Sequence, residues 1–344
     1  MVRARTTWPI SPEHAMSSGI GPACRWPMEC DSMRNGSGNM ARVLLKARPT
    51  KPQLDDRLTQ GPIEGLELYL DAIDISGPDW CENLVSLVRS YSVPSEFAWV
   101  VEGPLRSLDD NFFNIARNAQ ADREVIRRVC RIGQLLGAKA AVIHCIAPVR
   151  DPALVDGPAR AEALSQAVEF LRYYATVCRD SGLVPTVENI PPIARMREST
   201  TMHSSIGMEP TDLIYFADNV DGLRLTLDVS HAQLYINAAR GDSDQPSDLQ
   251  PLFSVLRARR VASNLDEFID LVADRVFEVH VSNATGVWGE GLPYERGELN
   301  LDAIMARLLP LVHYIVTETI EPNADQATLM RQARERILAV RSRL

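Results

Sequence analysis

The chain has 344 residues, of which 45 are acidic and 36 basic, and its formal net charge is −9 at neutral pH. This acidic balance argues against a nucleic-acid partner, because phosphate binding needs a basic surface. We expect no membrane partner, since no apolar run approaches the ~18 residues that a bilayer span requires. The six cysteines are scattered without a C-x-x-C pair, which favours a reducing, cytoplasmic location over a disulfide framework or a thiolate zinc site.

Two segments stand apart from the regular pattern of the chain. Residues 1–39 lack hydrophobic periodicity and are rich in Gly, Pro, Ser and Met, so we expect a disordered or irregular N-terminal segment. They also lack the apolar centre of a signal peptide. Residues 40–344 are expected to form one catalytic domain. Within it, 241–262 is an insertion whose amphipathic, locally basic character suits a subunit contact or a solvated flap.

From Met40 onward, short β-rich segments alternate with amphipathic helical ones. Strands are predicted at 41–47, 65–73, 95–103, 138–145, 183–189, 222–229, 275–282 and 313–320. The clearest helices are predicted at 120–136, 160–180, 210–219, 264–274, 301–309 and 325–343, with Gly137 ending the first of them. Eight strand–helix repeats in about 300 residues predict an α/β fold, a (β/α)8 TIM barrel, with a doubly wound sheet as the alternative. The absence of a G-x-G-x-x-G after the first strand and of a P-loop favours the barrel.

Five consecutive predicted strands end in a residue that can bind a metal or transfer a proton. His144 ends the fourth strand, Glu188 the fifth, Asp228 the sixth, His280 the seventh and Glu318 the eighth. Active sites of such barrels lie at the carboxyl ends of the strands, so these side chains are expected on one rim. Three carboxylates and one imidazole suit one divalent ion, Mn²⁺, Co²⁺, Mg²⁺ or Zn²⁺, with a position open for substrate. Burying these carboxylates together without a cation would be costly.

Several segments resemble the xylose-isomerase-like barrels: VIHCIAP (142–148), TVENIPP (186–192), LTLDVSHAQLY (225–235), EVHVSN (278–283), RGELNLDAI (296–304) and VTETIEP (316–322). That family includes ketose 3-epimerases, hydroxypyruvate isomerases, inosose dehydratases and endonuclease-IV-type enzymes. The resemblance covers about residues 40–343 and implies that Glu188, Asp228, His280 and Glu318 bind the metal. In the epimerase branch, the residues matching Glu188 and Glu318 are also the acid–base pair. His231 would hold the oxygens of the substrate.

This assignment agrees with the geometry of a barrel. Strands five and eight lie three apart around a ring of eight, so Glu188 and Glu318 can face a substrate from different sides. Removing a proton α to a carbonyl and returning one to the opposite face gives epimerisation, whereas returning it to the neighbouring carbon gives isomerisation. We therefore predict a divalent-metal-dependent isomerase or epimerase whose substrate is a sugar, sugar phosphate or keto acid. A homodimer or homotetramer is the expected assembly.

Departures from the family pattern keep other functions open. The chain lacks the additional Asp-x-His that endonuclease-IV-type enzymes carry after strand seven, and Glu102 replaces their strand-three histidine. His144 resembles the strand-four histidine of that branch, and it could be a second-metal ligand, a substrate contact or a wall residue. The arginine that epimerases carry after the strand-seven histidine is missing, and Arg296 is a candidate substitute. The alternatives are a metal-dependent lyase or dehydratase, a small-molecule phosphodiester hydrolase and a non-catalytic sugar-binding barrel.

Further candidate substrate contacts lie at strand ends or in the loops beyond them. Lys46 ends strand one and could bind a phosphate or carboxylate, and Asn189 directly follows strand five. His203 lies in the polar loop 197–207, where a lid would be placed, and Trp288 in a Gly-rich loop could stack against a sugar. A solvated loop position is the plain alternative for Lys46 and His203. The full set of candidate substrate contacts is His231, His144, Lys46, Glu102, Asn189, His203, Trp288 and Arg296.

Overall fold

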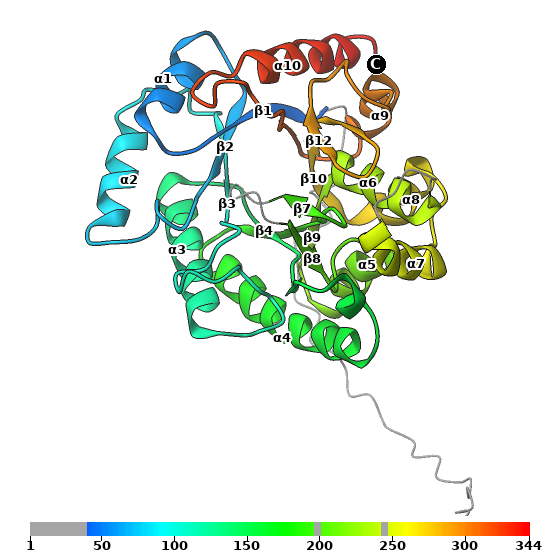
Figure 1. Cartoon of the computed structure of the whole chain (residues 1–344). Coiled ribbons are helices and arrows are strands. Elements are labelled where there is room, and N and C mark those ends of the chain that lie inside the picture. The colour runs from blue at the N-terminus through cyan, green and yellow to red at the C-terminus, as the bar shows by residue number, and fades with distance from the viewer. Residues whose placement is uncertain (1–39, 196–200, 242–246) are drawn as a thin grey trace, which may run out of the picture.

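The computed structural model describes residues 40–195, 201–241 and 247–344, and the predicted segment 1–39 lies outside these ranges. Within them, eight parallel strands close into a barrel that helices surround (Figure 1). The wall consists of β1 (Arg42–Ala47), β2 (Gly65–Tyr69), β3 (Ala98–Glu102), β4 (Ala140–His144), β6 (Val184–Glu188), β9 (Arg224–Asp228), β10 (Val276–Val281) and β13 (Tyr314–Thr317). Each pairs with the next wall strand along the chain, and β13 closes the ring against β1. The predicted TIM barrel is confirmed, and the doubly wound alternative is wrong.

The helices lie outside the barrel because each presents an apolar stripe to the strands. They are α1 (Lys51–Thr59), α2 (Trp80–Arg89), α3 (Gln120–Leu136), α4 (Pro158–Asp180), α5 (Pro210–Asn219), α6 (Val229–Arg240), α7 (Gln250–Arg259), α8 (Leu265–Val272), α9 (Leu301–Leu308) and α10 (Thr328–Arg341). In α3, Val125, Val129 and Ile132 recur at three- and four-residue spacing and are fully buried. Gly137 ends α3 in the left-handed conformation, with φ of 69°. Among the described helices, none is both long and apolar enough to cross a membrane.

The interior of the barrel changes from apolar to charged along its axis. Leu44, Val100, Val142 and Val316 belong to a small buried cluster that is separate from the larger core beneath the helices. Side chains alternate along a strand, so the next residue on the same face lies two positions later. These next positions hold Lys46, Glu102, His144 and Glu318. The apolar layer therefore closes the barrel directly beneath a layer of charged groups at the carboxyl ends of the strands.

Two small antiparallel sheets lie after wall strands, and they include parts of the predicted polar loop 197–207 and of the predicted Gly-rich loop that holds Trp288. In one, β8 (Thr201–Ser204) pairs with β5 (Pro148–Val149) and with β7 (Ala194–Arg195). In the other, β11 (Asn283–Thr285) and β12 (Gly289–Leu292) form a hairpin directly after β10. The polar loop predicted at 197–207 contains a strand, β8, in its described part, while 196–200 lie outside the described residues. Backbone pairing gives both segments a fixed shape.

The predicted insertion 241–262 contains the 3₁₀-helix η3 (Ser247–Leu249) and α7, while residues 242–246 lie outside the described ranges. A further 3₁₀-helix, η2 (Pro152–Val155), packs against α7, and η4 (Ala273–Arg275) precedes β10. Arg259 at the end of α7 places Nη2 2.6 Å from Oε1 of the buried Glu209 and Nη1 3.1 Å from Oδ1 of Asp156. Ion pairs therefore attach α7 to the barrel, so this part of the insertion is not a solvated flap.

Candidate metal centre

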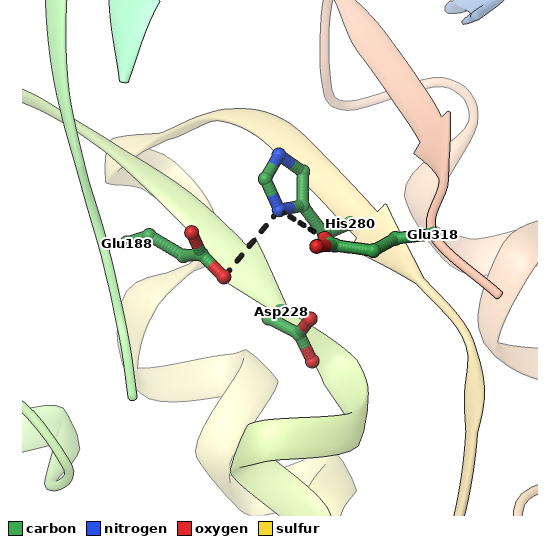
Figure 2. Close-up of side chains that lie close together, drawn as sticks. All are labelled: Glu188, Asp228, His280 and Glu318. Carbon is green, nitrogen blue, oxygen red and sulfur yellow. Dashed lines mark ion pairs between the residues drawn. The ribbon is translucent and has the colours of Figure 1, made fainter. Parts of the chain in front are cut away.

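Four strand ends bring Glu188, Asp228, His280 and Glu318 together at the carboxyl end of the barrel (Figure 2). One ligand atom from each residue lies within 4.8 Å of the others, so the group could hold a metal ion. His280 Nδ1 lies 2.7 Å from Glu318 Oε2 and 3.4 Å from Glu188 Oε1. The Glu318 side chain is 30% exposed, whereas the side chains of the other three are at most 2% exposed. The centre therefore opens to solvent beside Glu318.

The turn from β9 into α6 explains the Asp-x-x-His spacing. Asp228 is the N-cap of α6, and its Oδ1 accepts a hydrogen bond of 2.7 Å from the backbone N–H of His231. Asn189 fixes the same turn, because its Oδ1 accepts from the Asp228 N–H at 2.8 Å and its Nδ2 donates to the Asp228 carbonyl at 3.0 Å. The cap uses one carboxylate oxygen of Asp228, so the other remains for a metal ion. Both groups of the Asn189 amide are engaged in positioning Asp228 rather than facing a substrate.

A carboxylate outside the predicted set orients His280. Glu67 on β2 places Oε2 3.1 Å from His280 Nε2, and both side chains are fully buried. With Nε2 donating to Glu67, Nδ1 is directed toward Glu188 and Glu318, and a bound ion would replace the Nδ1 proton. Metal-binding histidines commonly donate their second nitrogen to a carboxylate in this way, which fixes the ring and strengthens the ligand. Glu67 is thus a positioning residue for the candidate centre.

A second group of potential ligands shares Glu188 with the first. His144 Nε2 lies 3.3 Å from Glu102 Oε1 and 3.6 Å from Glu188 Oε2, and ligand atoms of the three residues lie within 4.8 Å of one another. Lys46 reaches the same region, with Nζ 2.5 Å from Glu102 Oε2 and 2.5 Å from Glu318 Oε1. The predicted residues Lys46, Glu102 and His144 therefore belong to one continuous charged cluster with the four expected ligands.

Neighbouring cations keep the two central glutamates ionised. Burial opposes the charge of Glu188, but His280, His144 and a hydrogen bond from His231 hold the pKa of this carboxyl well below its usual value. Burial acts against Glu318 in the same way, and Lys46 together with His280 lowers its pKa to about 2. Both carboxylates are therefore charged at neutral pH, as metal binding and proton abstraction require.

Other carboxyl groups of the cluster resist ionisation. Burial raises the pKa of Asp228 to about 6 and, despite Lys46, the pKa of Glu102 well above its usual value. Burial and the nearby Glu67 also raise the pKa of Glu278, two residues before His280 on β10. Among the Lys and Arg side chains of the described residues, Lys46 is the one that forms ion pairs with these carboxyl groups. The cluster holds six buried or half-buried carboxyl groups: Glu67, Glu102, Glu188, Asp228, Glu278 and Glu318. Such an excess of acid is a favourable environment for a divalent cation.

The hairpin after β10 adds one more acid to the rim. His231 Nδ1 lies 2.9 Å from the Asn189 carbonyl oxygen and 3.4 Å from Glu188 Oε1, while its Nε2 lies 3.5 Å from Oε2 of Glu290 on β12. Burial opposes a charge on His231, but Asp228 and Glu188 raise its pKa well above the usual value. The sequence carries no signal for Glu290, because only the hairpin brings it to His231. Glu278 could have been found from its two-residue spacing to His280 on a strand.

Three predicted substrate contacts lie outside this cluster. His203 is buried in β8, and its Nδ1 lies 3.2 Å from the carbonyl oxygen of Pro192. Trp288 is half-buried in the turn between β11 and β12. Arg296 is exposed and lines an outer groove of about 600 Å³ together with Tyr294 and Ile320. The structure therefore assembles the residues predicted at strand ends but leaves these three loop residues apart from the ligand group.

A family model and several solved structures are similar to this chain. The family model described as "Xylose isomerase-like TIM barrel" matches residues 63–340. The chain belongs to this family. Among solved structures, a D-tagatose 3-epimerase-like protein is 17% identical with a TM-score of 0.60, and the match covers 88% of this chain and 99% of that one. The structure of an L-ribulose 3-epimerase is 12% identical, with a TM-score of 0.56 and coverage of 88% and 97%.

The nuclease branch is represented as well. The crystal structure of an AP endonuclease, family 2, from Brucella melitensis is 13% identical with a TM-score of 0.55, and the match covers 86% of this chain and 99% of that one. No curated protein matches the chain. At these identities the solved structures establish the shared barrel. Family membership and the sugar epimerases among its structural neighbours support an enzyme, and the reaction has to be argued from the site itself.

Proposed function

We propose that the protein is a divalent-metal-dependent isomerase or epimerase that transfers a proton α to the carbonyl of a sugar, sugar phosphate or keto acid. The observation that carries this proposal is the group of Glu188, Asp228, His280 and Glu318 on one rim, with two ionised glutamates from different strands and one open side. A homodimer or homotetramer in the cytoplasm remains our expectation. The four free thiols in the described part of the chain agree with a reducing compartment.

The residues present fit a divalent ion. His280 Nδ1 lies 2.7 Å from Glu318 Oε2 and 3.4 Å from Glu188 Oε1, so a ring nitrogen and two carboxylate oxygens converge on one buried point. This is the donor set with which proteins bind divalent ions, an imidazole nitrogen whose second nitrogen is held by a carboxylate together with carboxylate oxygens. Carboxylate oxygens with one imidazole suit Mn²⁺, Co²⁺, Mg²⁺ or Zn²⁺. The bound ion would polarise the substrate carbonyl and stabilise the negative charge that develops when the α-proton leaves.

The side chains around the ion would divide the remaining tasks. Glu318 is the more exposed glutamate and is placed to take the proton from the substrate carbon, while Glu188 on β6 is placed to return one from another side. His231 carries a raised pKa and turns Nε2 toward the rim beside Glu290, so it can donate to a substrate oxygen. Asn189 and Glu67 hold Asp228 and His280 in position.

Proton exchange with solvent tests the proposal directly. The metal-loaded protein is incubated in D2O with a panel of ketoses, ketose phosphates and keto acids, and loss of the α-proton signal is followed by NMR. Replacing Glu318 or Glu188 by Gln is expected to slow exchange at least ~10²-fold, since general acid–base groups contribute about 10²–10⁴. Glu82→Gln, on the exposed face of α2, is the control and should exchange at the wild-type rate. Absence of exchange with every substrate, or exchange that survives both rim substitutions, would contradict the proposal.

A metal-dependent lyase or dehydratase, or a phosphodiester hydrolase of a small molecule, is the second candidate. The specific observation in its favour is the group Glu102, His144 and Glu188, which offers a further set of ligands beside the first. Two neighbouring metal ions commonly serve displacement reactions at phosphorus. Loss of water from a substrate in the same incubations, or cleavage of an added phosphodiester such as bis(p-nitrophenyl) phosphate to an alcohol and a phosphomonoester, would favour this candidate over the isomerase.

A further inference from the structure

The described residues form three sets of potential ligands in this cluster, and Glu188 belongs to two of them. Its Oε1 lies 3.4 Å from His280 Nδ1 in the first set, Glu188, Asp228, His280 and Glu318. Its Oε2 lies 3.6 Å from His144 Nε2 in the second set, Glu102, His144 and Glu188. The third set, Glu67, Glu278 and His280, shares His280 with the first. Ligands about 2.1 Å from a tetrahedral ion lie about 3.4 Å apart. The distances of 3.3 Å and 3.6 Å from His144 Nε2 to Glu102 and Glu188 therefore suit an ion in the second set as well.

A fixed positive charge already lies against the second set. The Lys46 ammonium is 2.5 Å from Glu102 Oε2, 2.5 Å from Glu318 Oε1 and 3.4 Å from Glu67 Oε1. Its side chain is 10% exposed, so solvent screens these contacts only weakly. A divalent ion bound by Glu102 would have to share that carboxylate with the ammonium and would be repelled by it. The first set meets Lys46 only through Glu318, which directs its other oxygen to His280.

We propose that Lys46 is a built-in cation that takes the place of a second metal ion, so that this barrel holds one ion in the first set while the second set stays free of metal. The inference rests on the proposed function only in requiring the first ion. The Lys46 ammonium lies against Glu102, where a second ion would have to bind, and still leaves the shared Glu188 available to one metal. The chain thereby keeps the ligand geometry for two ions but uses a single one.

Metal content measured by elemental analysis tests this role without relying on activity. The protein is purified with excess Mn²⁺ and freed of unbound ions. The wild type is expected to carry about one ion per chain, and Lys46→Met, which removes the charge with little change in shape, about two. Lys46→Arg keeps the charge and should stay at one. In the Lys46→Met, Glu102→Gln double variant, the second set also loses the Glu102 carboxylate as a ligand, so the content should return to one.

Electron paramagnetic resonance of the Mn²⁺ forms gives a second measurement. Two ions that share Glu188 are expected to be magnetically coupled, so the spectrum of Lys46→Met should differ from that of the isolated ion in the wild type. If Lys46→Met folds only with metal, the ion count of the recovered protein still decides: two supports the proposal and one overturns it. Two ions in the wild type would also overturn it.

The outcomes separate this inference from the proposed function. One ion in both the wild type and Lys46→Met would refute the role of Lys46 and leave the isomerase proposal standing. No bound ion in the wild type would overturn the proposed metal centre, and the role of Lys46 with it.

Discussion

Replacing Glu67 with Gln should weaken metal binding about 10- to 100-fold and leave the fold intact, as for other carboxylates that orient a metal-binding histidine. Glu67 Oε2 lies 3.1 Å from His280 Nε2, and neither side chain is accessible to solvent. Glutamine keeps the size of the side chain and one acceptor oxygen, but it loses the negative charge that makes His280 a stronger ligand. The expected loss corresponds to about 1.4–2.8 kcal/mol of binding free energy, at about 1.4 kcal/mol per tenfold.

Competition with a chromophoric chelator at fixed pH measures this loss, and thermal unfolding of the metal-free protein checks the fold. Glu278→Gln is the matched control, because Glu278 is equally buried, lies two residues from His280 and makes no hydrogen bond. Burial raises its pKa well above the usual value and it makes no hydrogen bond to His280, so its replacement should change metal affinity much less than Glu67→Gln does. Wild-type affinity in Glu67→Gln, with unchanged unfolding, would refute the orienting role of Glu67.

Two further predictions concern protons and the backbone. The pKa of Asp228 is about 6 and that of His280 is raised well above its usual value, so metal binding should release protons and strengthen as pH rises. Calorimetry in buffers of different ionisation enthalpy should show more protons released at pH 5.5 than at pH 7.5, and a pH-independent affinity would contradict this reasoning. Gly207→Ala should lower the free energy of unfolding by ~2 kcal/mol or more, because Gly207 has a φ of +86° and an added Cβ would overlap the Cys145 carbonyl oxygen. Gly182→Ala, with a φ of +73° and open space around it, should cost only about 1 kcal/mol in the same urea titration.

The fold was largely predictable because each wall strand is a short buried segment followed by a helical stripe. Helix α3 is predicted and observed over the same residues, 120–136. Strand ends are less certain: the segment 95–103 gives a strand only over 98–102, and 313–320 only over 314–317. β-rich composition continues past the last backbone pairing, and pairing depends on the neighbouring strand. Strands of two residues, such as β5 and β7, are too short to show any periodicity.

The site was predictable where a residue's position follows from its strand. Asp228 and His280 lie at strand ends, and their strands fix where they meet. Glu67 was not assigned, because the alternation of Leu66, Glu67 and Leu68 does not by itself say which face of the strand lines the barrel. The positions of Glu290 and Arg296 depend on the path of the segment after β10, and this path cannot be predicted from the sequence. The hairpin turns Glu290 toward His231 and leaves Arg296 at an outer groove.

Several hydrogen bonds connect the β11–β12 hairpin to other segments of the barrel. Asn237 Nδ2 donates to the Gly286 carbonyl at 2.7 Å, Glu298 Oε1 accepts from the Gly286 N–H at 2.6 Å, and the Ile320 N–H donates to the Gly291 carbonyl at 2.8 Å. A hairpin held by these hydrogen bonds is ordered before any substrate binds. Substrate binding therefore does not have to offset the conformational entropy lost when the hairpin becomes ordered. In many enzymes the opening of a loop limits turnover and masks the chemical step. We expect no such masking from this hairpin, and a substrate deuterated at the reacting carbon should show a full primary isotope effect on turnover.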